Sequence, residues 1–195
     1  MGIRNEDQII IYDNSDVISS CRCWYNFIYF GHNPKLIYVL DGGLKKWIIK
    51  KKILTNSLSQ IKTSFYKATE NKGMVKNKEQ IDKNIILNQF KVIDARSVER
   101  FNGKIAEPRK NLRNGSIQNS FCLPFSDLIN KDGTFIDKNK ILDKFKSIKC
   151  ELDINLVFSC GSGVTASVLA LAYSLINNKY MPKIYDGSWS EYGKI

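Results

Sequence analysis

Residues 156–165 read LVFSCGSGVT, a short apolar run that passes directly into a loop with two glycines. The apolar run predicts a buried strand, and the apolar pattern over residues 164–176 predicts a helix. Because Gly161 and Gly163 can adopt positive φ values, the loop between these elements can curl around the sulfur of Cys160. A buried strand, a tight loop and a helix in this order indicate an α/β protein.

This loop is suited to hold an anion. A curled loop points backbone N–H groups at its centre, and the helix that follows adds the positive end of its dipole. We therefore expect Cys160 to be a thiolate near neutral pH, with the hydroxyls of Ser162 and Thr165 as further donors. A cysteine phosphatase would need an arginine six positions after the cysteine, where this chain has Ala166. The plainer alternative is a buried structural cysteine at a strand end.

Histidine chemistry, disulfides and a membrane span are all disfavoured. The only histidine is His32, which excludes most Cys–His and Ser–His mechanisms unless His32 itself reaches the site. Five cysteines without a secretory signal do not make a disulfide framework, and Cys21 and Cys23 are too close together for a zinc site. No apolar run is long enough to cross a membrane, so we expect a soluble cytoplasmic protein.

The net charge of +11 comes from 30 basic residues, only 6 of them arginine, against 19 acidic residues. Such a balance is compatible with nucleic-acid binding. However, the lysines are scattered, and proteins that read nucleic-acid sequence usually cluster arginine and aromatic residues. Nucleic-acid binding is therefore the weakest alternative. The arginines are more informative, because four of the six fall within 18 residues: Arg96, Arg100, Arg109 and Arg113.

Strands and helices alternate along the rest of the chain, which predicts a mainly parallel sheet flanked by helices. Residues 51–78 are rich in lysine, serine and asparagine and are predicted to be a linker. Further strands are expected at residues 8–12, 36–40, 90–93, 116–121 and 183–185, and further helices at 20–30, before Trp47, from Glu79 onward, at 97–101 and at 140–147.

The two ends of the chain repeat one another. In each, a strand, a loop, a helix and a second strand lead to an Asp-Gly pair. The loop of the first copy starts at Asp13 and that of the second at Cys160, so only one copy carries a nucleophile. We therefore divide the chain into residues 1–50, a linker at residues 51–78 and residues 79–195.

Two motifs of the second copy resemble a known family. CGSGVTA at residues 160–166 and YDGSW at residues 185–189 resemble the C-terminal half of 3-mercaptopyruvate sulfurtransferases, in the rhodanese family. Residues 12–47 resemble the end of that family's inactive N-terminal domain. The resemblance implies a catalytic rhodanese-like domain at residues 79–195, preceded by a partial second rhodanese-like domain at residues 1–50 that lacks its first half.

The resemblance also implies a reaction. Cys160 would take the sulfur of 3-mercaptopyruvate as a persulfide, pyruvate would leave, and a thiol such as thioredoxin, or cyanide, would accept the sulfur. Ser162 would assist catalysis, and no metal or organic cofactor is implied. Arg100 and Arg109 would bind the carboxylate and keto group of the substrate, since a guanidinium fork grips a carboxylate. The other loop residues would complete the substrate site: Gly161, Gly163, Val164 and Thr165.

Two further residues and the substrate preference follow from the same segments. Asp94 and Arg96 come after a predicted strand, and we expect them to brace the loop structurally. Thiosulfate-preferring rhodaneses usually carry a basic residue directly after the catalytic cysteine. Gly161 and Ser162 therefore favour mercaptopyruvate, with thiosulfate as a lesser donor.

Departures from the family leave alternatives open. The family's N-terminal domain supplies an acidic residue and a histidine that face the cysteine, and neither has a counterpart here. At residues 115–119, GSIQN replaces the usual GHIPG. The chain is therefore a sulfurtransferase of mercaptopyruvate or of thiosulfate, or a catalytically impaired or non-catalytic rhodanese-like module. An incomplete first domain would also leave an apolar face uncovered, which predicts poor solubility, self-association or a partner that covers this face.

Overall fold

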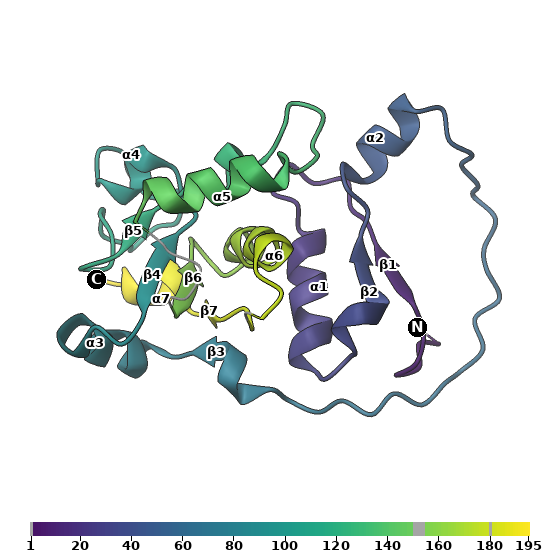
Figure 1. Ribbon diagram of the computed structural model, residues 1–195, viewed down its shortest axis with the longest axis horizontal. Coiled ribbons are helices and arrows are strands. Elements are labelled where there is room, and N and C mark those ends of the chain that lie inside the picture. Colours follow the sequence, from purple (N-terminus) through teal and green to yellow (C-terminus); the bar gives the residue numbers. More distant parts are fainter. Residues whose placement is uncertain (1, 150–154, 180) are drawn as a thin grey trace.

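A five-stranded parallel sheet forms the centre of the protein in the computed structural model, which describes residues 2–149, 155–179 and 181–195 (Figure 1). The strand order is β3-β7-β6-β4-β5, and all neighbouring strands are parallel. In the central pair, Val92 lies opposite Val157 and Asp94 lies opposite Ser159. The strands are β3 (Val75–Lys76), β4 (Lys91–Asp94), β5 (Phe121–Cys122), β6 (Leu156–Ser159) and β7 (Ile184–Tyr185).

Helices cover both faces of this sheet. Successive side chains along a strand point to opposite faces, and because both sets are apolar here, each face needs a cover. Ile93 and Phe158 belong to an apolar core shared with α5 and α6. Val92 and Val157 belong to a second core, shared with α3 and α7. The helices of the chain are α1 (Ser20–Tyr29), α2 (Gly43–Ile49), α3 (Lys78–Leu87), α4 (Val98–Phe101), α5 (Lys138–Ser147), α6 (Ala166–Ile176) and α7 (Ser188–Tyr192).

The first 50 residues form a separate two-stranded parallel sheet of β1 (Ile9–Ile11) and β2 (Ile37–Val39). Helix α1 connects the two strands and packs against α6, so that it lies between the small sheet and the large one (Figure 1). Its buried side chains join the core of the large sheet. The N-terminal part of the chain is therefore packed directly onto the helix that follows the Cys160 loop. The α1 residues in that core are Trp24, Tyr25 and Ile28.

The structure confirms the predicted α/β class, with a parallel sheet flanked by helices. The strand predicted at residues 116–121 was wrong except for Phe121, because the preceding residues form a turn. In that turn Asn119 adopts a φ of 60°, and Ser120 donates from both its backbone and its hydroxyl to the carbonyl of Ile117. Strand β3 was missed, since it lies inside the predicted linker at residues 51–78. The division into domains stays a prediction.

Residues 52–71 form neither helix nor strand and run from α2 past α1 toward β3 (Figure 1). The end of this stretch is fastened to the end of α1, where the N–H groups of Thr69 and Asn71 donate to the carbonyls of Phe30 and Tyr29. Across the described ranges, no helix combines the length and the apolar character needed to cross a membrane.

One face of the two-stranded sheet is apolar and open to solvent. Ile10, Tyr12 and Tyr38 have exposed fractions of 64%, 60% and 45%, and Ile10 lies directly opposite Tyr38 in the sheet. Contiguous exposed apolar surface beside the unpaired outer edge of a strand is typical of a contact site. Ile10 and Tyr12 also line a groove of about 390 Å³, together with Leu40, Leu44, Trp47, Ile53, Leu54 and Thr55.

We expect the protein to self-associate through this face, as measured by sedimentation velocity over a concentration series. Replacing Ile10 and Tyr38 together by threonine keeps strand-compatible side chains but removes most of the apolar area, so the associated fraction should fall. Ile86→Gln, at an 85% exposed position on α3, is the matched control and should leave association unchanged. A wild-type protein that sediments as one monomeric species at every concentration would contradict the prediction.

Candidate active site

The backbone of the Cys160 loop is hydrogen-bonded to the segment that follows β7. The Cys160 N–H donates to the hydroxyl of Ser188 over 3.1 Å, and the Cys160 carbonyl accepts from the Trp189 N–H over 2.9 Å. The carbonyl of Gly161 accepts from the Ser190 N–H over 2.8 Å. These bonds fix the backbone on both sides of the cysteine, which is itself buried.

The loop curls in the way that its glycines allow. Gly163 adopts a φ of +80°, a conformation that residues with a side chain rarely adopt. The N–H of Ser162 donates to the sulfur of Cys160 over 3.4 Å, and α6 begins directly after the loop at Ala166. The sulfur thus lies at a turn that supplies a backbone donor and precedes a helix N-terminus. The ionisation of Cys160 stays a prediction.

A cavity of about 360 Å³ opens at this loop. It brings together six of the residues predicted for catalysis and substrate binding beside Cys160, while Gly163 lies in the loop but does not line the cavity. Two unpredicted residues, Val17 and Pro108, complete the wall. The predicted residues in the lining are Cys160, Ser162, Arg100, Arg109, Gly161, Val164 and Thr165.

Two guanidinium groups face the backbone beside the cysteine. Arg109 donates from Nη1 to the Gly161 carbonyl over 3.2 Å and from Nη2 to the hydroxyl of Ser162 over 3.0 Å. A Cβ atom at Gly161 would lie 3.2 Å from Nη2 of Arg100 and 3.7 Å from Nη1 of Arg109. Glycine at this position therefore lets both cations approach the loop, and two cations beside one cavity are chemically suited to an anion.

Asp94 and Arg96 form a buried ion pair at the end of β4. Nη2 of Arg96 lies 2.7 Å from the Asp94 carboxylate and donates to the Gly115 carbonyl over 2.8 Å. Nη1 of Arg96 lies 2.7 Å from Glu107, which in turn accepts from Nη2 of Arg100 over 2.5 Å. Arg96 thus connects the end of β4 to Glu107, which orients Arg100 toward the Cys160 loop.

Glu107 is the acceptor that holds this network together. Burial alone would favour its neutral form, but the hydrogen bonds and charges of Arg100 and Arg96 hold the pKa of Glu107 below its usual value of 4.5. Sequence reasoning did not assign it a role. The available signal was an acidic residue placed among four arginines in an otherwise lysine-rich chain.

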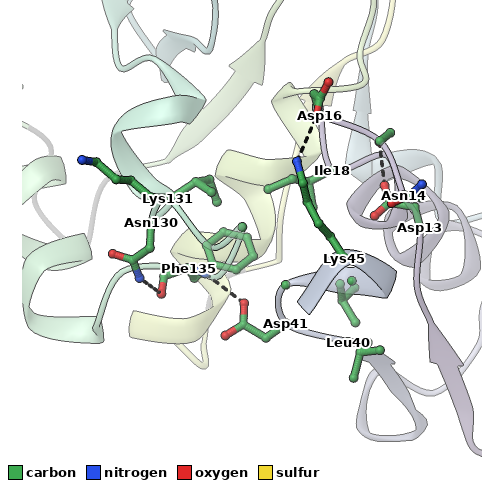
Figure 2. A pocket seen from close by; sticks show the side chains of 16 residues that line it. Asp13, Asn14, Asp16, Ile18, Leu40, Asp41, Lys45, Asn130, Lys131 and Phe135 are labelled. Atoms are coloured by element: carbon green, nitrogen blue, oxygen red, sulfur yellow. Dashed lines mark hydrogen bonds and ion pairs between the residues drawn. The ribbon is translucent and has the colours of Figure 1, made fainter. Parts of the chain in front are cut away.

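The first repeat has an equivalent loop that is closed by its own carboxylate. Oδ2 of Asp13 accepts from the hydroxyls of Ser15 and Ser19 over 2.8 Å each and from the Ser20 N–H over 2.9 Å. Figure 2 shows the cavity of about 180 Å³ beside this loop, where Asp41 accepts from the Phe135 N–H over 2.9 Å. This second cavity joins the first repeat to the loop before α5.

His32 does not line the Cys160 cavity. Its ring is buried in the N-terminal part, with Nδ1 3.1 Å from the Tyr66 hydroxyl and Nε2 3.0 Å from the carbonyl of Asp7. Within the described residues, no group of three or more His, Cys, Asp and Glu side chains is arranged to hold a metal ion.

Comparisons with known proteins agree with the fold. A family profile described as "Rhodanese-like domain" matches residues 1–50. Among solved structures, SseA from Escherichia coli, a 3-mercaptopyruvate sulfotransferase with the rhodanese fold, matches with a TM-score of 0.82 and 28% identity. That match covers 97% of this chain and 70% of SseA. The chain thus belongs to the rhodanese family.

Within the family, the relatives carry the names of both sulfur donors. Human 3-mercaptopyruvate sulfurtransferase is 34% identical over 98% of this chain and 64% of its own length. Mouse thiosulfate sulfurtransferase is 33% identical over 98% of this chain and 65% of its own length. An Arabidopsis thaliana thiosulfate/3-mercaptopyruvate sulfurtransferase, named as mitochondrial, is 31% identical over 98% of this chain and 55% of its own. The chain spans less than two thirds of these relatives, and its cytoplasmic location stays a prediction.

We expect Glu107→Gln to destabilise the protein by about 3 kcal/mol at neutral pH, because it leaves the half-buried Arg100 without its anion and the buried Arg96 with only one of its two carboxylates. Since the folded pKa is lowered, the stability from Glu107 is present above about pH 4.5 and lost as pH falls through the folded pKa. The difference between variant and wild type in urea unfolding should therefore shrink below that pH.

Glu79→Gln is the control, because Glu79 pairs with Lys83 on an exposed helix surface, where ion pairs contribute little. A Glu107→Gln protein as stable as this control at neutral pH would show that the network does not hold the fold.

Proposed function

We propose that the protein is a sulfurtransferase that moves sulfur from 3-mercaptopyruvate to a thiol or cyanide through a persulfide on Cys160. The observation that carries the proposal is the pairing of Cys160 with Arg100 and Arg109 around one cavity. A nucleophilic sulfur beside two fixed cations suits a small anionic donor. The relatives that bear sulfurtransferase names support the same reaction class.

In the first half-reaction, the Cys160 thiolate attacks the sulfur of 3-mercaptopyruvate. An S–S bond forms, the C–S bond breaks, and its electron pair leaves with the carbon as the enolate of pyruvate, which then takes up a proton. Arg100 and Arg109 bind the carboxylate and the keto oxygen, on which negative charge increases as the bond breaks. The Ser162 hydroxyl, which accepts from Arg109 over 3.0 Å and lines the cavity, would donate or relay that proton.

In the second half-reaction, the persulfide on Cys160 is consumed. The acceptor, a thiolate such as that of thioredoxin or a cyanide ion, attacks the outer sulfur, and the S–S bond breaks to release the Cys160 thiolate. Backbone donors such as the Ser162 N–H, together with the N-terminus of α6, stabilise the negative charge both of the persulfide and of the thiolate of Cys160. Donor and acceptor use the same cavity in turn, so the kinetics should be ping-pong.

The donor preference is the finer part of the proposal. Gly161 and Ser162 follow the cysteine where thiosulfate-preferring rhodaneses usually have a basic residue, which favours mercaptopyruvate. Thiosulfate remains the alternative donor, because one group of relatives carries that name.

A second candidate function is a catalytically impaired or non-catalytic rhodanese-like module. The observation that favours it is the composition of the cavity wall, which among the described residues includes neither a histidine nor a carboxylate. Proton transfer would then depend on Ser162 and on water.

Incubation with 3-mercaptopyruvate should add the mass of one sulfur atom to the intact protein, as measured by mass spectrometry. Cys160→Ser should abolish the added mass, since the attacking thiolate is gone. Cys23→Ser removes an exposed cysteine outside the cavity and should leave it unchanged. A wild-type protein that gains no sulfur from mercaptopyruvate or from thiosulfate would favour the non-catalytic module.

Arg109→Ala should lower kcat/KM for 3-mercaptopyruvate by roughly 10- to 150-fold. This corresponds to the loss of about 1.5–3 kcal/mol of charge-assisted hydrogen bonding to the carboxylate or keto oxygen. Lys110→Ala removes one positive charge from the neighbouring exposed position and should have little effect. Equal kinetics for the two variants would exclude Arg109 from substrate binding.

A further inference from the structure

One side chain of the N-terminal part reaches the Cys160 loop. Arg22, on α1, donates from Nη1 to the Asp186 carboxylate over 2.6 Å and to the carbonyl of Gly163 over 3.4 Å. Gly163 belongs to the cysteine loop, and Asp186 follows β7. The single guanidinium therefore links α1 to two segments of the large sheet.

The contact is close-packed. A Cβ atom on Gly163 would lie 2.8 Å from Nη1 of Arg22 and 3.0 Å from Oδ1 of Asp186, so only glycine leaves room for the ion pair. The Gly163 carbonyl also accepts from the hydroxyl of Ser167 over 3.1 Å. Because a trans peptide is planar, fixing this carbonyl on the outer side directs the N–H of Val164 to the opposite side. Val164 is part of the cavity wall.

Asp186 extends the effect to the other side of the loop. Within the next four residues, Ser188, Trp189 and Ser190 make the hydrogen bonds that hold the backbone of Cys160 and Gly161. Arg22 therefore links Gly163, at one end of the loop, to Asp186, at the start of the segment that holds Cys160 and Gly161.

We propose that Arg22 is a positioning residue for sulfur transfer, which keeps the Cys160 loop in its anion-binding shape from the N-terminal part of the chain. Its role in turnover rests on the proposed sulfurtransferase function, whereas its role in loop shape does not. Arg22 does not line the cavity, so the donor still binds through Arg100 and Arg109 when Arg22 is removed. The loss should therefore appear in kcat rather than in KM.

The first test measures turnover of 3-mercaptopyruvate by the full chain. Arg22→Ala should lower kcat roughly 10- to 100-fold, the scale expected for a small displacement of a catalytic group, with KM changed less than about 3-fold. Arg22→Lys keeps a donor and the charge and should recover part of kcat. The control is Lys46→Ala, which breaks another ion pair between the two parts, with Asp132 at 3.2 Å, away from the cavity.

The second test needs no sulfur transfer. The rate of alkylation of Cys160 is measured with anionic iodoacetate and with neutral iodoacetamide. The rate with iodoacetate divided by the rate with iodoacetamide reports how well the loop receives an anion. The ratio should fall in Arg22→Ala and stay at the wild-type value in Lys46→Ala. If the wild type does not turn over, the proposed function fails while this ratio still tests Arg22.

Asp186→Ala separates positioning from simple charge. Removing a negative charge near the loop would by itself raise the iodoacetate-to-iodoacetamide ratio, whereas loosening the loop lowers it. A lower ratio in Asp186→Ala supports the proposal. A raised ratio, a rise in KM at unchanged kcat in Arg22→Ala, or an Arg22→Ala protein that matches Lys46→Ala in both tests overturns it. Should Arg22→Ala fail to fold, Arg22→Lys and Asp186→Ala decide by the same criteria.

Discussion

The arrangement of the site depends on the buried guanidinium of Arg96. Its donors bind the Asp94 carboxylate at the end of β4, the Glu107 carboxylate and the Gly115 carbonyl, and its Cζ atom lies 4.5 Å from the ring centroid of Trp189. The backbone of Trp189 in turn holds the Cys160 carbonyl. One rigid planar cation thus sets the positions of the end of β4, of Glu107 (which holds Arg100) and of the Cys160 loop together. Lysine, with a single flexible ammonium, could not satisfy this set of acceptors.

Around this centre, Arg96 and Arg100 are paired with carboxylates, whereas Arg109, which also lines the cavity, has no ion pair among the described residues. Glu107 is shared by Arg96 and Arg100, which leaves Arg100 directed at Gly161 rather than bound to a carboxylate of its own. Arg109 contacts only the loop's carbonyl and hydroxyl oxygens among the bonds found for it. The glycines of the loop are part of the same constraint, because a side chain at Gly161 or Gly163 would occupy the space of Arg100 or Arg22.

Local features of the chain were readable from the sequence, and contacts between distant segments were not. The buried strand β6, the glycine loop and α6 follow from apolar pattern and glycine spacing. The arginine cluster indicated two residues that line the cavity, Arg100 and Arg109. Strand β3 has two residues in a polar stretch and carries no periodicity to detect. Val17 and Arg22 reach the cysteine loop across some 140 residues of chain, and nothing local to them indicates that contact.

The two copies of the strand–loop–helix unit use the same anion-binding geometry in opposite ways. In the first copy, the N–H at the start of α1 and two serine hydroxyls bind Asp13, a carboxylate built into the loop itself. That loop is satisfied internally and can serve as a rigid base for α1. In the second copy, Cys160 occupies the equivalent position, and the hydrogen bond found for its sulfur among the described residues is the 3.4 Å contact with the Ser162 N–H. Under the proposed function, the donors of the second loop receive the incoming anion, while the first loop, whose donors bind Asp13, supplies the helix from which Arg22 contacts Gly163. Under the proposed function, an exchange of carboxylate for thiol at the start of the loop separates a structural copy from a reactive one.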